Sequence, residues 1–262
     1  MVFRSVRRVS RAALLGILFT APYAACAAAK PVHILGTDWG LTLKSDGTGF
    51  YNDLARLVLP PSLGKIDYEI LPYKRAKRAF LANKTRCFYP NNLGYLLSSG
   101  TLRGRDAFIG SKSVLAVQSR VFSMHGARPP AGPGDLKGQR VAYALGSDVA
   151  IQLKGTGAYL VAVSDEVGKA RMLLEGRTDL LVAVLPDAKF VFDSLGTNLP
   201  PYDPAFALTA TEIGVVCHAT EENKTFIKAF DLHLEGLVSS GELRAFLVSH
   251  GLDPEAHMPR QQ

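Results

Sequence analysis

Two short polar segments of this sequence each follow an apolar run and could hold a small molecule. The first is a Gly-Ser-Asp turn at residues 146–148, whose small and capping residues are those that open a helix. Free N–H groups and the dipole at a helix N-terminus favour an anion, so this turn predicts an anion-binding site, with a plain helix cap as the alternative. The second segment, residues 184–187, contains a proline and an aspartate.

Both segments belong to consecutive strand–helix units. We expect strands at residues 139–145, 159–164 and 179–185, and a helix at 166–175. Strands this apolar, separated by helices, are typical of a parallel sheet that is covered on both faces. Ligands of such sheets bind at the carboxyl ends of the strands, where both polar segments lie. This half of the protein is therefore predicted to form one wall of a small-molecule site.

The first part of the chain repeats the strand–helix pattern. We expect strands at residues 32–37, 67–71 and 86–89, and helices at 50–59 and 73–82. A second α/β unit is therefore predicted before residue 113.

Two β-rich segments are the candidate crossings between these units. Residues 113–124 and 206–218 each adjoin a Pro-rich stretch that forms neither helix nor central strand. Two crossings predict two lobes, in which residues 30–118 and 213–262 form lobe 1 and residues 119–212 form lobe 2.

The N-terminus predicts secretion. Four arginines precede an apolar run at residues 12–20, and Ala-rich sequence follows at 24–29. This is the pattern of a signal peptide, which we assign to residues 1–29, and it places the protein in the periplasm. The apolar run is shorter than the ~20 residues that span a bilayer. A weak lipoprotein box ending at Cys26 leaves acyl anchoring as an alternative.

The charge of the chain is concentrated in this leader. The formal net charge is +7, and the leader contributes four arginines and no acid, which leaves the secreted chain near +3. No Lys/Arg-rich run remains beyond the leader, so nucleic acid is not expected as a partner.

Few other residues suggest covalent or metal chemistry. Cys87 and Cys217 remain after the leader, and they could form a disulfide or stay buried free thiols. Neither cysteine has a partner at CxxC spacing, which argues against a zinc or redox site. The sequence also lacks a GxSxG elbow, a phosphate-binding loop with its lysine, and an HExxH helix. We therefore expect no metal, no cofactor and no catalysis.

Several motifs, in this order, resemble those of a known family. They are the signal peptide, Gly-Phe-Tyr-Asn-Asp-Leu at 49–54, Asp-Leu-Lys-Gly-Gln-Arg-Val at 135–141, Gly146-Ser147, and Leu-Glu-Gly-Arg-Thr-Asp at 174–179. Together they resemble the extracytoplasmic solute-binding proteins of the amino-acid-binding type (family 3-like), over nearly all of the secreted chain. The resemblance implies an α/β, two-lobed type II periplasmic-binding-protein fold, with a two-strand hinge that lets the lobes close over a small polar ligand.

The resemblance also implies ligand-binding residues. An arginine before the first hinge strand clamps the ligand carboxylate in such proteins, and Arg103 and Arg105 are the two candidates here, with solvated loop arginines as the alternative. Gly146 and Ser147 match the turn whose backbone amides and hydroxyl meet the ligand. Trp39 follows the first strand, where an aromatic ring could stack on a flat or cationic group or pack within the lobe.

Other positions of the resemblance fit less closely. Tyr73 and Arg75 are expected near the same cleft. Amino-acid-binding members hold the ligand ammonium with an aspartate at the position that Val184 occupies here. An α-ammonium would then be buried unpaired, so a standard α-amino acid is not the expected ligand. Asp38 or Asp148 could substitute, and each is equally explained as a strand-end or cap residue.

These observations predict a secreted, monomeric receptor for a small polar ligand that carries a carboxylate. The receptor would deliver its ligand to the permease of an ABC-type transporter. The first alternative is a sensory or accessory protein with a protein partner. The second is a periplasmic dehydratase of the same fold, which would need a general acid with a perturbed pKa at Asp148, Glu166 or Asp187.

Overall fold

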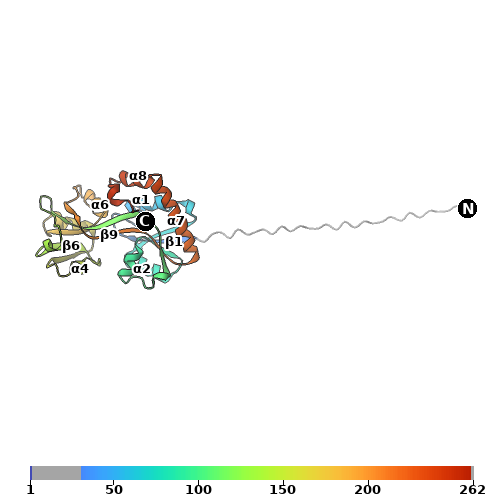
Figure 1. Cartoon of the computed structure of the whole chain (residues 1–262), viewed down its shortest axis with the longest axis horizontal. Coiled ribbons are helices and arrows are strands. Elements are labelled where there is room, and N and C mark those ends of the chain that lie inside the picture. The colour runs from blue at the N-terminus through green and yellow to red at the C-terminus, as the bar shows by residue number, and fades with distance from the viewer. Residues whose placement is uncertain (2–30, 261–262) are drawn as a thin grey trace.

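The computed structural model describes Met1 and residues 31–260, and the chain in this range forms two lobes joined by two long strands (Figure 1). The strands are β5 (Leu115–Ser123) and β9 (Tyr202–His218). The predicted signal peptide, from residue 2 onward, and Cys26 lie outside the described residues.

Lobe 1 is built on three parallel strands. β1 (Val32–Asp38) lies between β2 (Ile66–Pro72) and β3 (Arg86–Asn91). A short strand, β4 (Phe108–Gly110), pairs antiparallel with β9. The helices and turns of lobe 1 are α1 (Phe50–Val58), η1 (Pro61–Leu63), α2 (Tyr73–Ala82), α3 (Leu93–Ser98), η2 (Arg105–Ala107), α7 (Glu221–Ser239), α8 (Glu242–Ser249) and α9 (Pro254–His257).

The helices of lobe 1 cover its sheet with apolar faces. α1 buries Phe50, Leu54 and Val58, which recur at helical spacing. α7 is capped by Thr220, whose hydroxyl accepts a hydrogen bond from the Asn223 N–H. Its buried side chains join those of α1 in the largest hydrophobic cluster of the described chain. That cluster fixes the position of α1, which contributes to the contact between the lobes.

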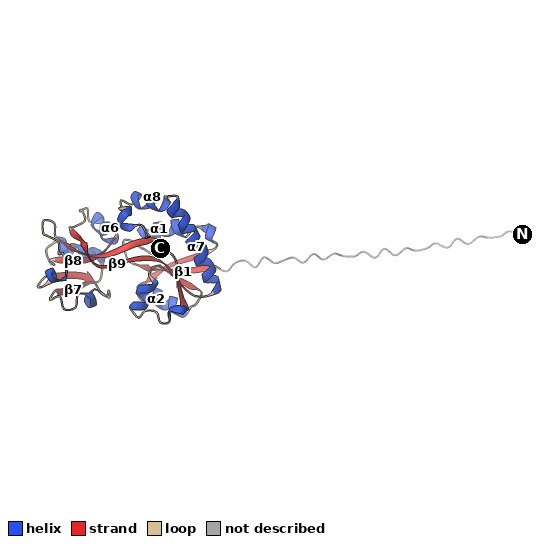
Figure 2. Cartoon of the chain, viewed as in Figure 1, coloured by secondary structure: helices blue, strands red, loops and turns tan. Residues whose placement is uncertain are grey.

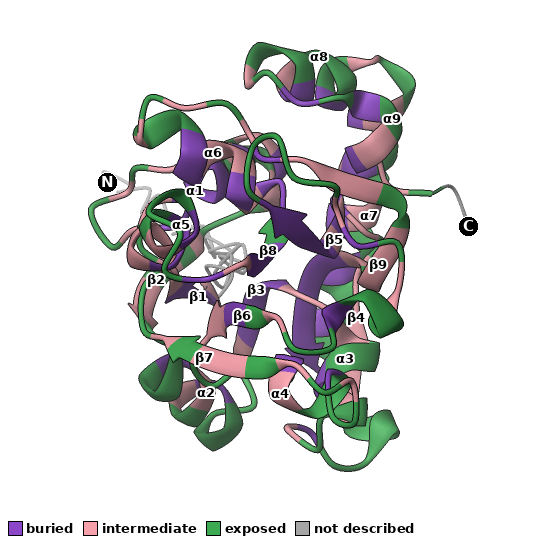
Figure 3. Ribbon diagram, turned by 90° about the vertical axis from the view of Figure 1, so that its left-hand side faces the viewer, coloured by how far each residue is buried: buried purple, intermediate pink, exposed green. Residues whose placement is uncertain are grey.

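Lobe 2 repeats the parallel arrangement. β6 (Arg140–Ala144) lies between β7 (Tyr159–Val163) and β8 (Leu180–Leu185). Its helices are η3 (Pro133–Leu136), α4 (Val149–Gln152), α5 (Glu166–Leu174) and α6 (Asp187–Ser194). Viewed from this lobe, the central strands are mostly buried and the outward faces of the helices are exposed (Figure 3).

The strands β5 and β9 join the two parallel sheets into one continuous strand order, β2-β1-β3-β9-β5-β8-β6-β7. Figure 2 shows β9 running from one lobe to the other. They pair antiparallel from Leu115↔Ile213 to Phe122↔Tyr202, with two irregularities of register. The two-lobed α/β fold with two crossing strands is confirmed. The lobe boundaries after residues 118 and 212 fall inside these strands and stay a prediction.

A disulfide joins Cys87 of β3 to Cys217 of β9. The two residues are directly opposite each other in the antiparallel pair. The sequence was compatible with either a disulfide or two free thiols, and the structure shows the disulfide. The bond fastens the returning strand β9 to the sheet of lobe 1.

No helix within residues 31–260 is long and apolar enough to cross a membrane.

Candidate functional site

The carboxyl ends of the two parallel sheets face each other across the gap between the lobes. Three side-chain hydrogen bonds span this gap. Asp187 at the start of α6 accepts from Thr42 and from Tyr51, and Asp148 before α4 accepts from Tyr95. The turns that follow β6 and β8 therefore face lobe 1. The sequence predicted these segments, 146–148 and 184–187, as a wall of a ligand site, and their contact with a ligand stays a prediction.

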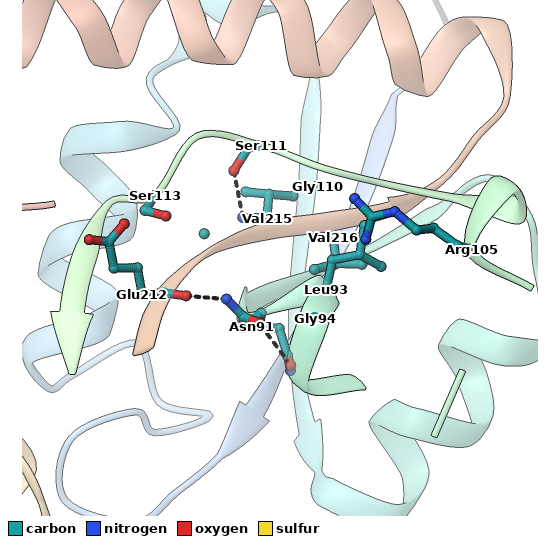
Figure 4. A pocket seen from close by; sticks show the side chains of 12 residues that line it. Asn91, Leu93, Gly94, Arg105, Gly110, Ser111, Ser113, Glu212, Val215 and Val216 are labelled. Carbon is teal, nitrogen blue, oxygen red and sulfur yellow. Dashed lines mark hydrogen bonds between the residues drawn. The ribbon is translucent and has the colours of Figure 1, made fainter. Parts of the chain in front are cut away.

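A pocket of about 270 Å³ lies on the lobe 1 wall, where β3, α3 and β4 meet the hinge strand β9. Figure 4 shows Arg105 and Glu212 at opposite ends of it, with Leu93 and Gly94 between them. Its other walls contain mainly small or polar residues: Asn91, Asn92, Gly110, Ser111, Ser113, Gly214, Val215 and Val216. The Ser111 hydroxyl accepts a hydrogen bond from the Val215 N–H at 2.8 Å. A small polar molecule fits the chemistry of this lining.

The two candidate arginines differ in their relation to this pocket. Both are exposed, and Arg105 lines the pocket whereas Arg103 is not among its lining residues. Gly104 between them has a φ of 78°, a left-handed conformation that separates the directions of its neighbours. The structure therefore favours Arg105 over Arg103 as the arginine of the site. Its contact with a ligand stays a prediction.

Asp187 is the centre of the closest polar contact between the lobes. Its Oδ1 accepts from the Thr42 hydroxyl at 2.6 Å, and its Oδ2 accepts from the Tyr51 hydroxyl at 2.8 Å. Thr42 is 3% exposed and Tyr51 is 1% exposed. Both oxygens of the carboxylate thus accept hydrogen bonds from lobe 1, and Asp187 takes part in the contact between the lobes.

Burial of this contact shifts its acid–base properties. Burial raises the pKa of Asp187 to about 6, against the lowering effect of the two hydroxyl hydrogen bonds. The charge of Glu166 on α5 adds to the rise. The pKa of Tyr51 is raised well above its ordinary value, first by burial and then by the charge of Asp187. Tyr51 is therefore a hydrogen-bond donor throughout the physiological range.

Apolar contacts surround the Asp187 contact. The rings of Phe50 on α1 and Phe190 on α6 stack with their centroids 4.9 Å apart. Leu41 of lobe 1 packs against the apolar cluster of lobe 2. This side of the gap is a packed interface, so the lobes touch through buried side chains as well as through the hinge.

The second polar contact lies on the α4 side of the gap. Oδ2 of Asp148 accepts from the Tyr95 hydroxyl at 2.9 Å. Burial raises the pKa of Tyr95 to about 12, and the hydrogen bond and charge of Asp148 contribute to the rise. Burial and the same charge raise the pKa of Tyr73, which begins α2. Asp148 and the two tyrosines therefore form one cluster, of which the sequence named Tyr73 as a candidate and Asp148 as an alternative, but not Tyr95.

The predicted anion site at Gly146 and Ser147 has a different local geometry from the one expected. The Ser147 hydroxyl donates to the Ala144 carbonyl at 2.8 Å, so its proton is used within its own turn. The following helix, α4, has only four residues. Such a helix sums few peptide dipoles, and the predicted attraction for an anion is correspondingly weak. Gly146 has a φ of 87°, which gives it a positional role in the turn.

The remaining predicted residues lie at the edge of lobe 1. Asp38 accepts from the Gly40 N–H at 2.9 Å, as a residue that ends a strand does. Trp39 is half-buried and meets Tyr51 edge to face, with ring centroids 5.1 Å apart. Arg75 is exposed in the first turn of α2. Trp39 is therefore tied to the Asp187 contact through Tyr51, whereas Asp38 and Arg75 have no contact that links them to the pocket.

The strand-end position of lobe 2 lacks a carboxylate, as the sequence indicated. Val184 is 38% exposed and lies opposite Ser119 in the β5–β8 pair. Among residues 31–260, no group of three or more His, Cys, Asp or Glu side chains is placed to hold a metal ion.

Sequence reasoning did not identify several residues of these walls. Tyr51 appeared only as part of a motif, and Thr42, Tyr95 and Glu212 were not singled out. Tyr95 had a local signal, because Asn92 is an N-cap residue and accepts from the Tyr95 N–H at 2.7 Å. No such signal pairs Thr42 with Asp187, since 145 positions separate them in the sequence.

Comparisons with known proteins add information on the fold. No protein-family model matches the chain, and no curated protein sequence matches it. Several solved structures, in contrast, are similar to the chain. A histidine kinase sensor domain with similarity to periplasmic binding proteins is 16% identical, with a TM-score of 0.63 over 85% of this chain and 96% of that one.

Two further similar structures are receptors of small solutes by their descriptions. The GluR0 ligand-binding core from Nostoc punctiforme, solved with L-glutamate, is 17% identical, with a TM-score of 0.63 over 83% of this chain and 97% of that one. The L-cystine solute receptor of Neisseria gonorrhoeae, in an unliganded open conformation, is 17% identical, with a TM-score of 0.58 over 82% of this chain and 92% of that one. The chain therefore has the two-lobed α/β fold of periplasmic solute-binding proteins of the amino-acid-binding type.

Proposed function

We propose that this protein is a secreted receptor that encloses a small polar ligand between its two lobes. The observation that carries the proposal is the Arg105 pocket, which lies on one of two facing walls built from the carboxyl ends of parallel strands. The fold shared with solute-binding proteins supports it, and so does the absence of known catalytic motifs in the sequence. A periplasmic location follows from the predicted leader.

The ligand carries a carboxylate in this proposal. The planar guanidinium of Arg105 can donate two parallel hydrogen bonds to a carboxylate, and the Ser113 hydroxyl and the Asn91 amide NH₂ of the pocket can donate further hydrogen bonds to it. Glu212 at the other end of the pocket limits how much negative charge the ligand can bring there.

Delivery to the permease of an ABC-type transporter is the first role we propose for the monomeric receptor. Sensing through a protein partner is the second, and the likeness to a histidine kinase sensor domain supports it. The genes next to this one discriminate the two roles. A permease and an ATPase favour transport, whereas a kinase or a cyclase favours sensing.

Catalysis is not part of the proposal. A dehydratase would need a general acid in the gap, and Asp187 has the raised pKa that such a role requires. Both of its oxygens accept hydrogen bonds from buried groups of lobe 1, however, and Asp187 does not line the Arg105 pocket. Incubation of the protein with cyclic carboxylic acids should show no turnover.

Thermal unfolding against a panel of organic acids, amino acids and other small polar metabolites tests the receptor. A ligand at about 100 times its Kd adds ~2.7 kcal/mol of stability, which raises the midpoint by several degrees. The Arg105→Gln variant should lose roughly tenfold or more in affinity for the stabilising compound. Arg103→Gln and the exposed lobe 2 control Arg128→Gln should bind as the wild type does. Equal affinity of all three variants would refute the role of Arg105.

A further inference from the structure

Asp148 occupies a helix N-cap position without capping the helix. It precedes α4, and its carboxylate accepts no hydrogen bond from the first turn of that helix. Asp165, the N-cap of α5 in the same lobe, behaves in the ordinary way and accepts from the Gly168 N–H at 2.6 Å. The Asp148 carboxylate is instead directed across the gap, where Tyr95 of the other lobe donates to it.

The negative charge of Asp148 is not balanced by the protein. Within residues 31–260, no cationic side chain forms an ion pair with it, and Oδ1 has no hydrogen-bond donor. Tyr95 supplies a hydrogen bond to Oδ2 but no positive charge. A half-buried carboxylate in this state attracts a cation.

Two aromatic rings adjoin this carboxylate. Tyr73 and Tyr95 are 47% and 44% exposed, so part of each ring is available to a bound molecule. The Tyr95 hydroxyl donates to Oδ2 of Asp148 at 2.9 Å, and the charge of Asp148 also raises the pKa of Tyr73. A carboxylate beside aromatic faces is the combination that recognises organic cations.

From this cluster we propose that Asp148, Tyr73 and Tyr95 bind a cationic group of the ligand, an alkylammonium or a guanidinium. The inference rests on the proposed function, since it concerns the molecule that the receptor encloses. It reverses the sign expected for the turn at 146–148, where sequence reasoning predicted an anion. Of the two residues that the sequence offered as substitutes for the aspartate missing at Val184, it selects Asp148 over Asp38, and it adds Tyr95 as a partner.

Three four-carbon compounds test the proposal, because they differ only in their terminal charges. They are 1,4-diaminobutane, 4-aminobutyrate and succinate, titrated calorimetrically into the full protein near neutral pH. 4-Aminobutyrate carries both the carboxylate proposed for Arg105 and an ammonium, so it should bind roughly tenfold or more tightly than succinate, and Asp148→Asn should weaken the binding of both amines by about the same factor. Asparagine keeps an oxygen that can accept from the Tyr95 hydroxyl, so this variant keeps the contact between the lobes.

Two further variants distinguish a specific binding site from a general effect of negative charge or of the contact between the lobes on amine affinity. Asp165→Asn removes the same charge from the same edge of lobe 2 and should change amine affinity less than about twofold. Tyr95→Phe removes the hydroxyl that spans the lobes and keeps the ring. Amine binding within roughly threefold of the wild type is expected for it, because the carboxylate then has both oxygens free.

Two results would overturn the inference without contradicting the proposed receptor function. One is succinate binding as tightly as 4-aminobutyrate, and the other is equal amine affinity in Asp148→Asn and the wild type. If Tyr95→Phe loses as much affinity as Asp148→Asn, the pair serves only to join the lobes, and the inference is also wrong. If no compound of the wider panel binds, the proposed function fails together with the inference.

Discussion

Replacement of Asp187 by asparagine should remove a pH dependence of stability that the contact between the lobes creates. The carboxyl group has an ordinary pKa of 3.8, and burial raises that pKa to about 6 in the folded protein. Asparagine has nearly the same shape and keeps one acceptor oxygen for Thr42 or Tyr51, but it does not titrate. The substitution therefore removes the proton equilibrium and retains most of the packing.

The sign and the size of the effect follow from the two pKa values. Because the pKa is raised on folding, the folded state binds this proton more tightly than the unfolded state does. The resulting stabilisation is complete below pH 3.8 and is lost as the pH rises through about 6. At ~1.36 kcal/mol per pKa unit, the shift corresponds to ~3 kcal/mol in the free energy of unfolding.

Urea denaturation between about pH 4 and about pH 7 measures this difference. The free energy of unfolding of the wild type, relative to that of Asp187→Asn, should fall by ~3 kcal/mol across this range. Asp179→Asn is a control of opposite sign. A hydrogen bond from Arg140, with 2.6 Å between Nη2 and Oδ1, lowers the pKa of Asp179. The stability from Asp179 is therefore present at neutral pH and is lost as the pH falls.

Parallel stability profiles for the wild type and Asp187→Asn would refute this reasoning. They would mean that water reaches the carboxylate and that burial does not raise its pKa. The two profiles could instead diverge toward neutral pH, with the wild type becoming the more stable protein. That result would show that the hydroxyl hydrogen bonds lower the pKa of Asp187 by more than burial raises it.

Two more predictions concern the same framework. Tyr51→Phe leaves Oδ2 of Asp187 without its donor and should cost ~1–3 kcal/mol at neutral pH in urea denaturation, with a smaller cost near pH 4, where the carboxyl group is protonated. A cost that is equal at both pH values would contradict the link to Asp187. Reduction of the disulfide between Cys87 and Cys217, which are separated by 130 positions, should lower stability by ~5 kcal/mol, and an unchanged midpoint in reductant would disprove this contribution.

Much of the fold could be predicted because its signals are local. The apolar run at 139–145 became β6 (Arg140–Ala144), and the run at 179–185 became β8 (Leu180–Leu185). Each run is bounded by turn or capping residues, so its limits are visible in the sequence. Parallel pairing followed from helices between apolar strands, and the registers of β6 with β7 and β8 confirm it.

The elements that were missed have ambiguous local signals. Pro186 indicated the end of a strand, and it also stands at the N-cap of α6 (Asp187–Ser194), which the sequence reasoning did not predict. The helix expected after residues 146–148 ends after four residues, and Gly155 and Gly157 follow it with positive φ angles. Glycines at these positions favour turns over a continued helix.

The site was less predictable than the fold because its contacts join distant parts of the chain. Tyr51 and Asp187 are 136 positions apart, and Tyr95 and Asp148 are 53 apart. No periodicity connects such pairs, and only the closure of two sheets against each other brings them within hydrogen-bond distance. The sequence could place Asp148 and Asp187 at strand ends, but it could not show which groups they face.

The two sides of the gap between the lobes differ in how much their separation costs. On the α6 side, opening must part the stacked rings of Phe50 and Phe190 and expose the hydroxyl groups that bind Asp187. On the α4 side, opening breaks the hydrogen bond of a tyrosine that is 44% exposed, and water can replace it there. A single exposed hydrogen bond contributes only ~0.5–1.5 kcal/mol, and buried aromatic contacts contribute more. We therefore expect the lobes to part first on the α4 side, so that opening exposes Asp148 and its two tyrosines to a ligand arriving from solvent.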